Sequence, residues 1–95
     1  MDLRELINND SATVIDVREV YEFDGGHVEG AINIPLGQVA DKLEEFAAMS
    51  KPLILCCASG NRSGQATAFL NAQGIEDAFN GGSWYQVHEV KMQNA

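Results

Sequence analysis

Apolar residues along the chain fall into short runs that alternate between the spacing of buried strands and the spacing of helices. Four runs rich in aliphatic or β-branched residues predict strands, at residues 12–17, 31–34, 53–57 and 76–79. Pro35 ends the second run, and Gly25 with Gly26 predicts a turn before it. We expect Gly81 and Gly82 to form another turn after the last strand.

The segments around these strands have helical spacing. Helices are expected at residues 3–7, 36–49 and 84–91, and in the segment that carries Ala66, Phe69 and Leu70. The segment 36–49 is predicted to form one amphipathic helix because its apolar residues recur at helical intervals, namely Val39, Leu43, Phe46 and Ala47. Gly74 is a natural stop for the helix before it. Tyr21 and Phe23 lie in a short polar-aromatic segment with no predicted element.

Strands that alternate with helices in this way are typical of βαβ units. The sequence therefore predicts an α/β fold, a small three-layer domain whose mainly parallel sheet of about four to five strands is flanked by helices on both faces. We expect residues 1–95 to form a single domain, because a chain of this length can bury one core. Ligands of such sheets bind at the carboxyl ends of the strands.

Composition and charge narrow the class of protein. With 45% hydrophobic and 21% charged residues the chain resembles soluble globular proteins, and no apolar run reaches the roughly 18–20 residues of a membrane span. Residues 1–5 lack the features of a signal peptide, so a cytoplasmic protein is expected. The net charge of −8 argues against nucleic acid and anionic membrane as partners.

Acidic residues are absent between Glu45 and Glu76, and Lys51 and Arg62 lie within this stretch. Either the stretch contains an anion-binding site, or it consists mostly of core strand and core helix. The sequence pattern leaves both interpretations open.

The two cysteines, Cys56 and Cys57, are neighbours in sequence. A disulfide between neighbours closes a tiny, strained loop, so we expect two reduced thiols in a reducing compartment. Side chains alternate along a strand, so the two thiols should face opposite ways. Cys56 is then the better candidate for the core, and Cys57 lies at the strand's end.

The chain runs from the strand at 53–57 through a small polar loop into a helix, with Ser63 as the expected N-cap. Gly60 permits the positive φ that such a tight loop requires. Unpaired amides at the helix start, together with the helix dipole, form a pocket for a negative atom. This setting lowers the pKa of a thiol and makes Cys57 a candidate nucleophile. A second core cysteine is the alternative.

The loop resembles a known active-site motif. Residues 57–64 (CASGNRSG) resemble the C-x-x-G-x-R-S-[GA] loop of the rhodanese-like sulfurtransferases. Residues 14–19 (VIDVRE) resemble the I-D-V-R-E strand of that family, and residues 26–35 (GHVEGAINIP) resemble its G-H-I-x-G-A-x-N-I-P segment. Residues 79–82 (FNGG) match a glycine pair near the end of these domains. The blocks occur in the family's order and span most of the chain.

This resemblance implies a sulfurtransferase in which Cys57 takes a sulfur atom from an anionic donor such as thiosulfate, holds it as a persulfide and passes it to cyanide or a thiol. The acceptor thiol would belong to a small molecule or to a thioredoxin-like protein. It also implies that the donor is bound by residues of the loop, namely Ala58, Ser59, Gly60, Asn61, Arg62 and Ser63. Neither a metal nor a cofactor is expected, and the protein would be a monomer or weak dimer. Ala58 is neutral where some relatives carry a basic residue, which disfavours thiosulfate as the preferred donor.

Two other functions fit parts of the pattern. Cys56 and Arg62 satisfy the C-x5-R count of cysteine phosphatases and arsenate reductases, but the nucleophile would then be the cysteine within the strand. No aspartate between Glu45 and Glu76 is available as a general acid. The second alternative is a rhodanese-like binding or regulatory module without turnover, although such modules generally lack the cysteine.

The remaining polar residues have structural interpretations. Asp16 and Arg18 lie two apart on one face of a strand, and we expect an ion pair or hydrogen bonds that anchor the loop. His27 is expected to be structural and His88 solvated, and neither has metal-ligand spacing to Cys57.

Overall fold

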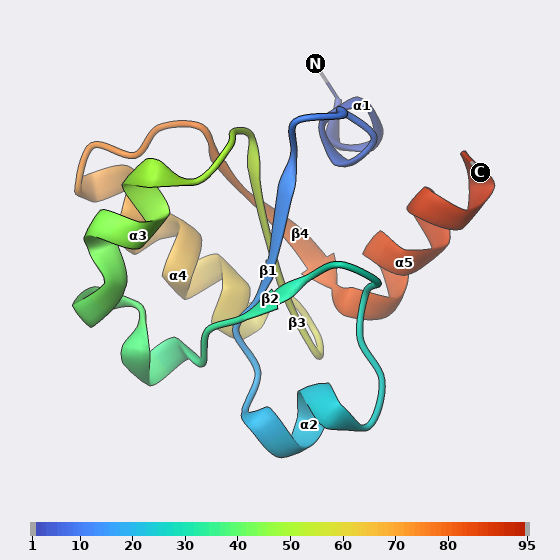
Figure 1. The fold of residues 1–95 in the computed structure, drawn as a ribbon, viewed down its shortest axis with the longest axis horizontal. Coiled ribbons are helices and arrows are strands. Elements are labelled where there is room, and N and C mark those ends of the chain that lie inside the picture. The colour runs from blue at the N-terminus through green and yellow to red at the C-terminus, as the bar shows by residue number, and fades with distance from the viewer. Residues whose placement is uncertain (1, 95) are drawn as a thin grey trace.

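Strands and helices alternate along the chain, as the apolar pattern predicts. The computed structural model describes residues 2–94 (Figure 1). The strands are β1 (Thr13–Asp16), β2 (Ile32–Asn33), β3 (Leu53–Cys57) and β4 (Ala78–Ser83). The helices are α1 (Leu3–Ile7), α2 (Val20–Asp24), α3 (Leu43–Ala48), α4 (Asn61–Ala72) and α5 (Trp84–Gln93).

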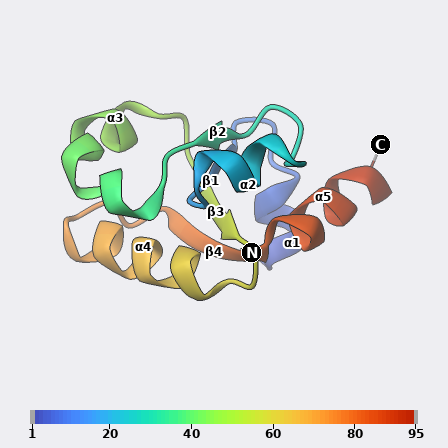
Figure 2. The same ribbon diagram turned by 90° about the horizontal axis from the view of Figure 1, so that it is seen from below.

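The strands form one parallel sheet in the order β2-β1-β3-β4. Helices α3 and α4 cover one face, and α1 and α5 cover the other, so the sheet is the middle of three layers (Figures 1 and 2). Helix α2 lies beyond the carboxyl ends of the strands (Figure 1). The predicted α/β fold is confirmed, with a four-stranded parallel sheet within residues 2–94.

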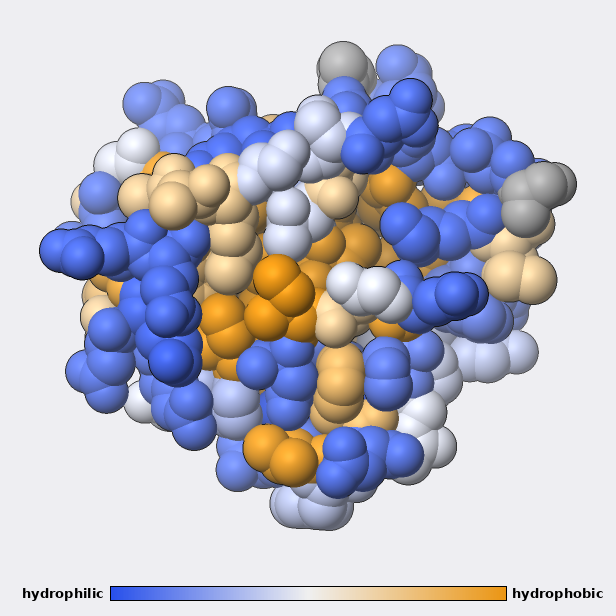
Figure 3. Space-filling model, viewed as in Figure 1, coloured by the Kyte–Doolittle hydropathy of each residue, from blue (hydrophilic) through white to orange (hydrophobic). Residues whose placement is uncertain are grey.

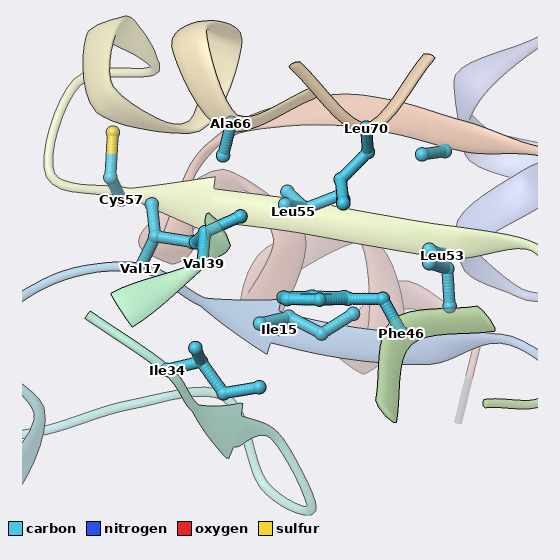
Figure 4. Close-up of a cluster of buried hydrophobic side chains, with 11 residues drawn as sticks. Ile15, Val17, Ile34, Val39, Phe46, Leu53, Leu55, Cys57, Ala66 and Leu70 are labelled. Atoms are coloured by element: carbon cyan, nitrogen blue, oxygen red, sulfur yellow. The ribbon is translucent and has the colours of Figure 1, made fainter. Parts of the chain in front are cut away.

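The central strand β3 is buried on both faces. Leu53, Leu55 and Cys57 belong to the core layer beneath α3 and α4 (Figure 4). Ile54 and Cys56 belong to the layer beneath α1 and α5. The prediction that the two cysteines face opposite ways is therefore confirmed, and both are free thiols.

The single helix predicted over residues 36–49 is wrong in its first half. Two 3₁₀ turns, Leu36–Gln38 and Ala40–Lys42, precede the short helix α3. Lys42 leaves the helical conformation, with φ −114° and ψ 25°. Gly37 weakens helix formation in this part of the segment. The apolar periodicity still directs Val39 and Phe46 into the core, so the pattern predicted burial correctly but not one continuous helix.

The turn predicted at Gly81 and Gly82 is also wrong, because strand β4 runs through both residues. A Cβ atom on Gly81 would lie 2.8 Å from a methyl carbon of Ile54 and 2.9 Å from one of Val87. Glycine therefore lets α5 approach the sheet closely. Gly82 has a φ of +88° and follows a shift in the register between β3 and β4.

An open groove borders the edge strand β2 and is lined in part by Ile32, Ile34, Ala48 and Met49. Apolar side chains gather near the centre of the face shown in Figure 3, with hydrophilic ones around them. None of residues 57–63 lines this groove. In the described part of the chain, no helix has both the length and the apolar character of a membrane span.

Candidate active site

Cys57 is the last residue of β3, at the edge of the sheet where parallel strands end. Its side chain is fully buried and packs in the core layer beneath α4. Figure 4 shows the sulfur pointing away from the labelled aliphatic side chains and toward the loop that leads into α4. The core thus fixes the orientation of the side chain while its sulfur atom faces the loop.

Three hydrogen-bond donors surround the sulfur. The amide nitrogen of Gly60 lies 3.0 Å from Sγ, and the amide nitrogen and hydroxyl oxygen of Ser63 each lie 3.4 Å away. Burial on its own would raise the pKa of the Cys57 thiol, but hydrogen bonds from Ser63, Ser59 and Gly60 outweigh it and lower the pKa. A lower pKa increases the fraction of thiolate, the nucleophilic form, at neutral pH.

Gly60 gives the loop the shape in which these donors converge. Its φ is +98°, and a Cβ atom would lie 3.2 Å from Cα of Gly82, so both the conformation and the close approach of β4 require glycine. Gly60 is also the N-cap of α4. The prediction that Ser63 is the N-cap is wrong, because the turn at Gly60 starts the helix at Asn61. Ser63 instead lies in the first turn and faces Cys57.

Asn80 on β4 holds the loop from the other side. Its Nδ2 donates to the carbonyl oxygen of Gly60 at 3.0 Å, and its Oδ1 lies 2.7 Å from the hydroxyl oxygen of Ser63. The one hydrogen of this hydroxyl is donated either to Oδ1 or to Sγ of Cys57. The amide of Gly82 also donates to Oδ1, at 3.0 Å. Asn80 therefore connects the glycine pair of β4 to the residues that surround the thiol. The sequence analysis quoted Asn80 within the FNGG block but gave it no role.

The other predicted substrate-binding residues lie at the outer side of the loop. Ala58, Ser59 and Asn61 have exposed side chains, and the structure brings none of these side chains to the sulfur. Ser59 does contribute its amide, which helps to lower the pKa of Cys57. In this loop the backbone, together with the Ser63 hydroxyl, provides the contacts with the thiol.

Arg62 forms a bidentate ion pair with Glu22 of α2. Nη1 lies 2.7 Å from Oε1, and Nη2 lies 2.9 Å from Oε2. Hydrogen bonds from Arg62 and from the Glu19 amide lower the pKa of Glu22 to about 2. Neither α2 nor a role for Glu22 was predicted from the sequence. The one local signal was the spacing of Glu19 and Glu22, which form a capping box at the start of α2.

A buried ion pair anchors α2 next to this loop. Arg18 and Asp16 lie 2.8 Å apart and are almost fully buried, which confirms the predicted ion pair. Arg18 also donates to the carbonyl oxygens of Glu22 and Gly26, at 3.3 and 2.7 Å, and its guanidinium lies 5.0 Å from the centre of the Trp84 ring. Arg18 thus contacts residues of β1, α2 and α5 and holds these elements together.

Cys56 has a different environment from Cys57. It lies in the opposite core layer, where burial and the charge of Asp16 raise its pKa to about 12. A thiol of this kind remains protonated and does not face the loop. The C-x5-R interpretation, which needs Cys56 as the nucleophile, is therefore incompatible with this geometry. His27 packs on the ring of Phe23 at 3.7 Å, in agreement with a structural role.

Comparison with known proteins agrees with this arrangement. The family model for the rhodanese-like domain matches residues 1–88, and the chain belongs to this family. It is 44% identical over 69 residues to the uncharacterized protein YqhL of Bacillus subtilis, a match that covers 73% of this chain and 54% of YqhL. It is 31% identical over 75 residues to the thiosulfate sulfurtransferase GlpE of Pseudomonas syringae, covering 79% of this chain and 70% of GlpE. The chain thus spans only about half the length of YqhL.

Solved structures share the fold. The human single-domain sulfurtransferase TSTD1 superposes with a TM-score of 0.73 at 29% identity, covering 92% of this chain and 89% of TSTD1. A rhodanese from E. coli, solved with anions, gives a TM-score of 0.72 at 32% identity, covering 79% of this chain and 89% of that one.

Proposed function

We propose that the protein is a sulfurtransferase of the thiosulfate sulfurtransferase type, with Cys57 as the residue that carries the sulfur. One observation above all supports this proposal, namely the Gly60 amide 3.0 Å from Sγ of Cys57, joined by two donors of Ser63. Relatives named thiosulfate sulfurtransferase support the same class of reaction. We also propose that residues 1–95 act as a single rhodanese-like domain, since one sheet joins all four strands of the described residues.

In the first step, the Cys57 thiolate attacks the outer sulfur of thiosulfate. A new S–S bond forms on Cys57, the S–S bond of thiosulfate breaks, and sulfite leaves with the bonding electron pair. The amides of Gly60 and Ser63 lie where they stabilise the negative sulfur both before and after this transfer. We assign donor binding to the loop residues Ala58, Ser59, Gly60, Asn61, Arg62 and Ser63.

In the second step, the outer sulfur passes to an acceptor. Cyanide attacks this sulfur, thiocyanate leaves, and the Cys57 thiolate is restored. A thiol acceptor, on a small molecule or on a thioredoxin-like protein, attacks in the same way and becomes the persulfide. Cys57 has to return to the free thiolate in each cycle, so we place the protein in a reducing compartment, the cytoplasm.

The test is the mass of the reduced protein after incubation with thiosulfate. We expect a gain of one sulfur atom, which cyanide removes as thiocyanate. Cys57→Ser should abolish this gain, and the matched variant Cys56→Ser should retain it. A gain that survives Cys57→Ser but not Cys56→Ser would move the nucleophile by one residue. No gain in the wild type, with thiosulfate or with an alkyl persulfide as the donor, would favour a binding module.

A further inference from the structure

The cationic side chain of the loop is already paired with an acid. Among residues 57–63, Arg62 is the only basic residue. Its two terminal nitrogens lie 2.7 and 2.9 Å from the two carboxylate oxygens of Glu22, in the fork geometry that makes such pairs specific. Both side chains are only partly exposed, with 32% of Arg62 and 21% of Glu22 accessible. An anion that reaches the loop therefore meets a neutral pair instead of a free guanidinium.

Glu22 is held in place independently of Arg62. Its Oε1 accepts from the amide of Glu19 at 3.0 Å, as part of the capping box that starts α2. Its carbonyl oxygen accepts from Arg18, which is itself buried against Asp16. Because α2 is fixed in this way, the Glu22 carboxylate is oriented toward Arg62 before any ligand arrives.

The remaining charges near the Arg62–Glu22 pair do not favour the binding of a dianion. Arg18, the other guanidinium near α2, is neutralised by Asp16 at 2.8 Å. Glu19, at the start of α2, adds a negative charge close enough to contribute to the raised pKa of Arg62. Ala58 and Ser59, which follow Cys57 in the loop, carry no charge. The donors around the thiol are therefore neutral, and the one basic side chain of the loop already has its charge compensated by Glu22.

We infer that Glu22 determines donor specificity, and that by occupying Arg62 it makes the site prefer alkyl persulfides over dianionic thiosulfate. This inference rests on the proposed sulfurtransferase function and names its donor class. Thiosulfate carries two negative charges at neutral pH and has to bind beside Glu22 or displace it from Arg62. An alkyl persulfide carries at most one charge, on the sulfur that the amides of Gly60 and Ser63 are placed to receive.

The transfer from such a donor is balanced without a further reagent. The Cys57 thiolate attacks the outer sulfur of the protonated persulfide, R–S–SH. A bond forms between Sγ and the outer sulfur, the S–S bond of the donor breaks, and the thiolate R–S⁻ leaves with the electron pair. Cys57 then holds the same persulfide that thiosulfate would produce, so the second step is unchanged.

The first experiment measures binding and needs no turnover. In a Cys57→Ser background, thiosulfate is titrated calorimetrically into protein with and without Glu22→Gln. Glutamine keeps an oxygen that accepts from the Glu19 amide, so α2 is retained while the charge is removed. We expect Glu22→Gln to tighten thiosulfate binding at least fivefold, and Arg62→Gln added to it to abolish this gain.

Glu44→Gln is the matched control, because it changes the net charge by the same amount. Glu44 is exposed on α3 and has no side-chain hydrogen bond or ion pair within residues 2–94. This control should leave thiosulfate binding unchanged. If Glu22→Gln alters binding by less than twofold, or if Glu44→Gln tightens it equally, Glu22 does not set specificity. Because Cys57 is replaced in this experiment, the binding result does not depend on whether Cys57 forms a persulfide.

The second experiment compares two donors with Cys57 intact. The rate of sulfur loading is measured by mass with thiosulfate and with an alkyl persulfide that has no other charged group. The persulfide donor is 2-hydroxyethyl persulfide, because it carries no charge besides that of the persulfide. We expect Glu22→Gln to raise the rate constant for thiosulfate about tenfold and to change that for the persulfide less than twofold. An equal change with both donors would overturn the inference while leaving the proposed function intact. Failure of the wild type to load sulfur from either donor would count against the proposed function itself.

Discussion

The side-chain amide of Asn80 donates a 3.0 Å hydrogen bond to the carbonyl oxygen of Gly60, across the gap between β4 and the Cys57 loop. Oδ1 of the same side chain lies 2.7 Å from the hydroxyl oxygen of Ser63. The two residues whose donors reach the sulfur are thus positioned by one asparagine on a neighbouring strand.

Asn80→Ala should therefore weaken the site without touching the thiol. With Gly60 and Ser63 less well fixed, we expect the rate of sulfur loading on Cys57 to fall about 10- to 100-fold. The pKa of Cys57, followed by the pH dependence of its alkylation, should rise, because the Gly60 contact that is disturbed, at 3.0 Å, is shorter than the 3.4 Å contact open to the released hydroxyl of Ser63. Asn71→Ala is the control, because Asn71 bonds the carbonyl oxygen of Ile75 at 2.9 Å near the other end of α4. If both variants leave the alkylation profile unchanged, Asn80 has no positioning role.

The hydroxyl of Ser63 should control the ionisation of Cys57. Because its hydrogen bond helps to lower the pKa of the thiol, Ser63→Ala should shift the midpoint of alkylation to higher pH. With Ser63 intact and Cys56 replaced by Ser, this midpoint should lie below the ordinary value of about 8.5. The measurement is the rate at which iodoacetamide alkylates Cys57 between about pH 5 and pH 10. With Ser63 intact, a midpoint at or above the ordinary value would contradict the lowered pKa.

Gly60 should be more sensitive to substitution than another glycine with the same backbone conformation. Gly60 and Gly74 have φ values of +98° and +92°, but a Cβ atom would meet Gly82 at 3.2 Å only at Gly60. We expect Gly74→Ala to lower the free energy of unfolding by about 1–2 kcal/mol, and Gly60→Ala to lower it further. Urea unfolding measures the difference. Equal losses would show that the approach of β4 imposes no constraint.

The buried ion pair of Asp16 and Arg18 should matter far more than an exposed one. Asp16→Asn leaves the guanidinium of Arg18 buried without its counter-charge, and we expect a loss of about 3–5 kcal/mol in the free energy of unfolding. The comparison is Lys42→Met, which removes the exposed pair with Glu45 at 3.7 Å and should cost less than about 1 kcal/mol. Urea unfolding at neutral pH measures both. Similar small losses for the two variants would mean that the buried guanidinium of Arg18 does not need the charge of Asp16.

The parts of the fold that the sequence predicted are those controlled by local pattern. The aliphatic runs of β1 and β3 specify strands buried on both faces, and alternation along β3 separates Cys56 from Cys57. The loop after β3 was recognisable because Gly60 and the polar residues around it have few conformations in common other than a tight turn before a helix.

What the sequence did not reveal depends on contacts between distant residues. Helix α2 has five residues and no apolar periodicity, and Glu22 on this helix pairs with Arg62, which lies 40 residues further along the chain. The glycine pair suggested a turn, but Gly81 is small because α5 packs against it. No local pattern distinguishes a glycine pair in a turn from one that makes room for a packed helix. The Glu22–Arg62 pair was missed for the same reason.

The placement of the two thiols in opposite layers of the core limits which groups can react with Cys57. Cys56, although next in sequence, cannot reach the loop to form a bond with an oxidised or sulfur-loaded Cys57. The 95-residue chain has no third cysteine. Within these residues Cys56 cannot take a sulfur atom from Cys57, so under the proposed function the acceptor has to approach the loop from outside this domain.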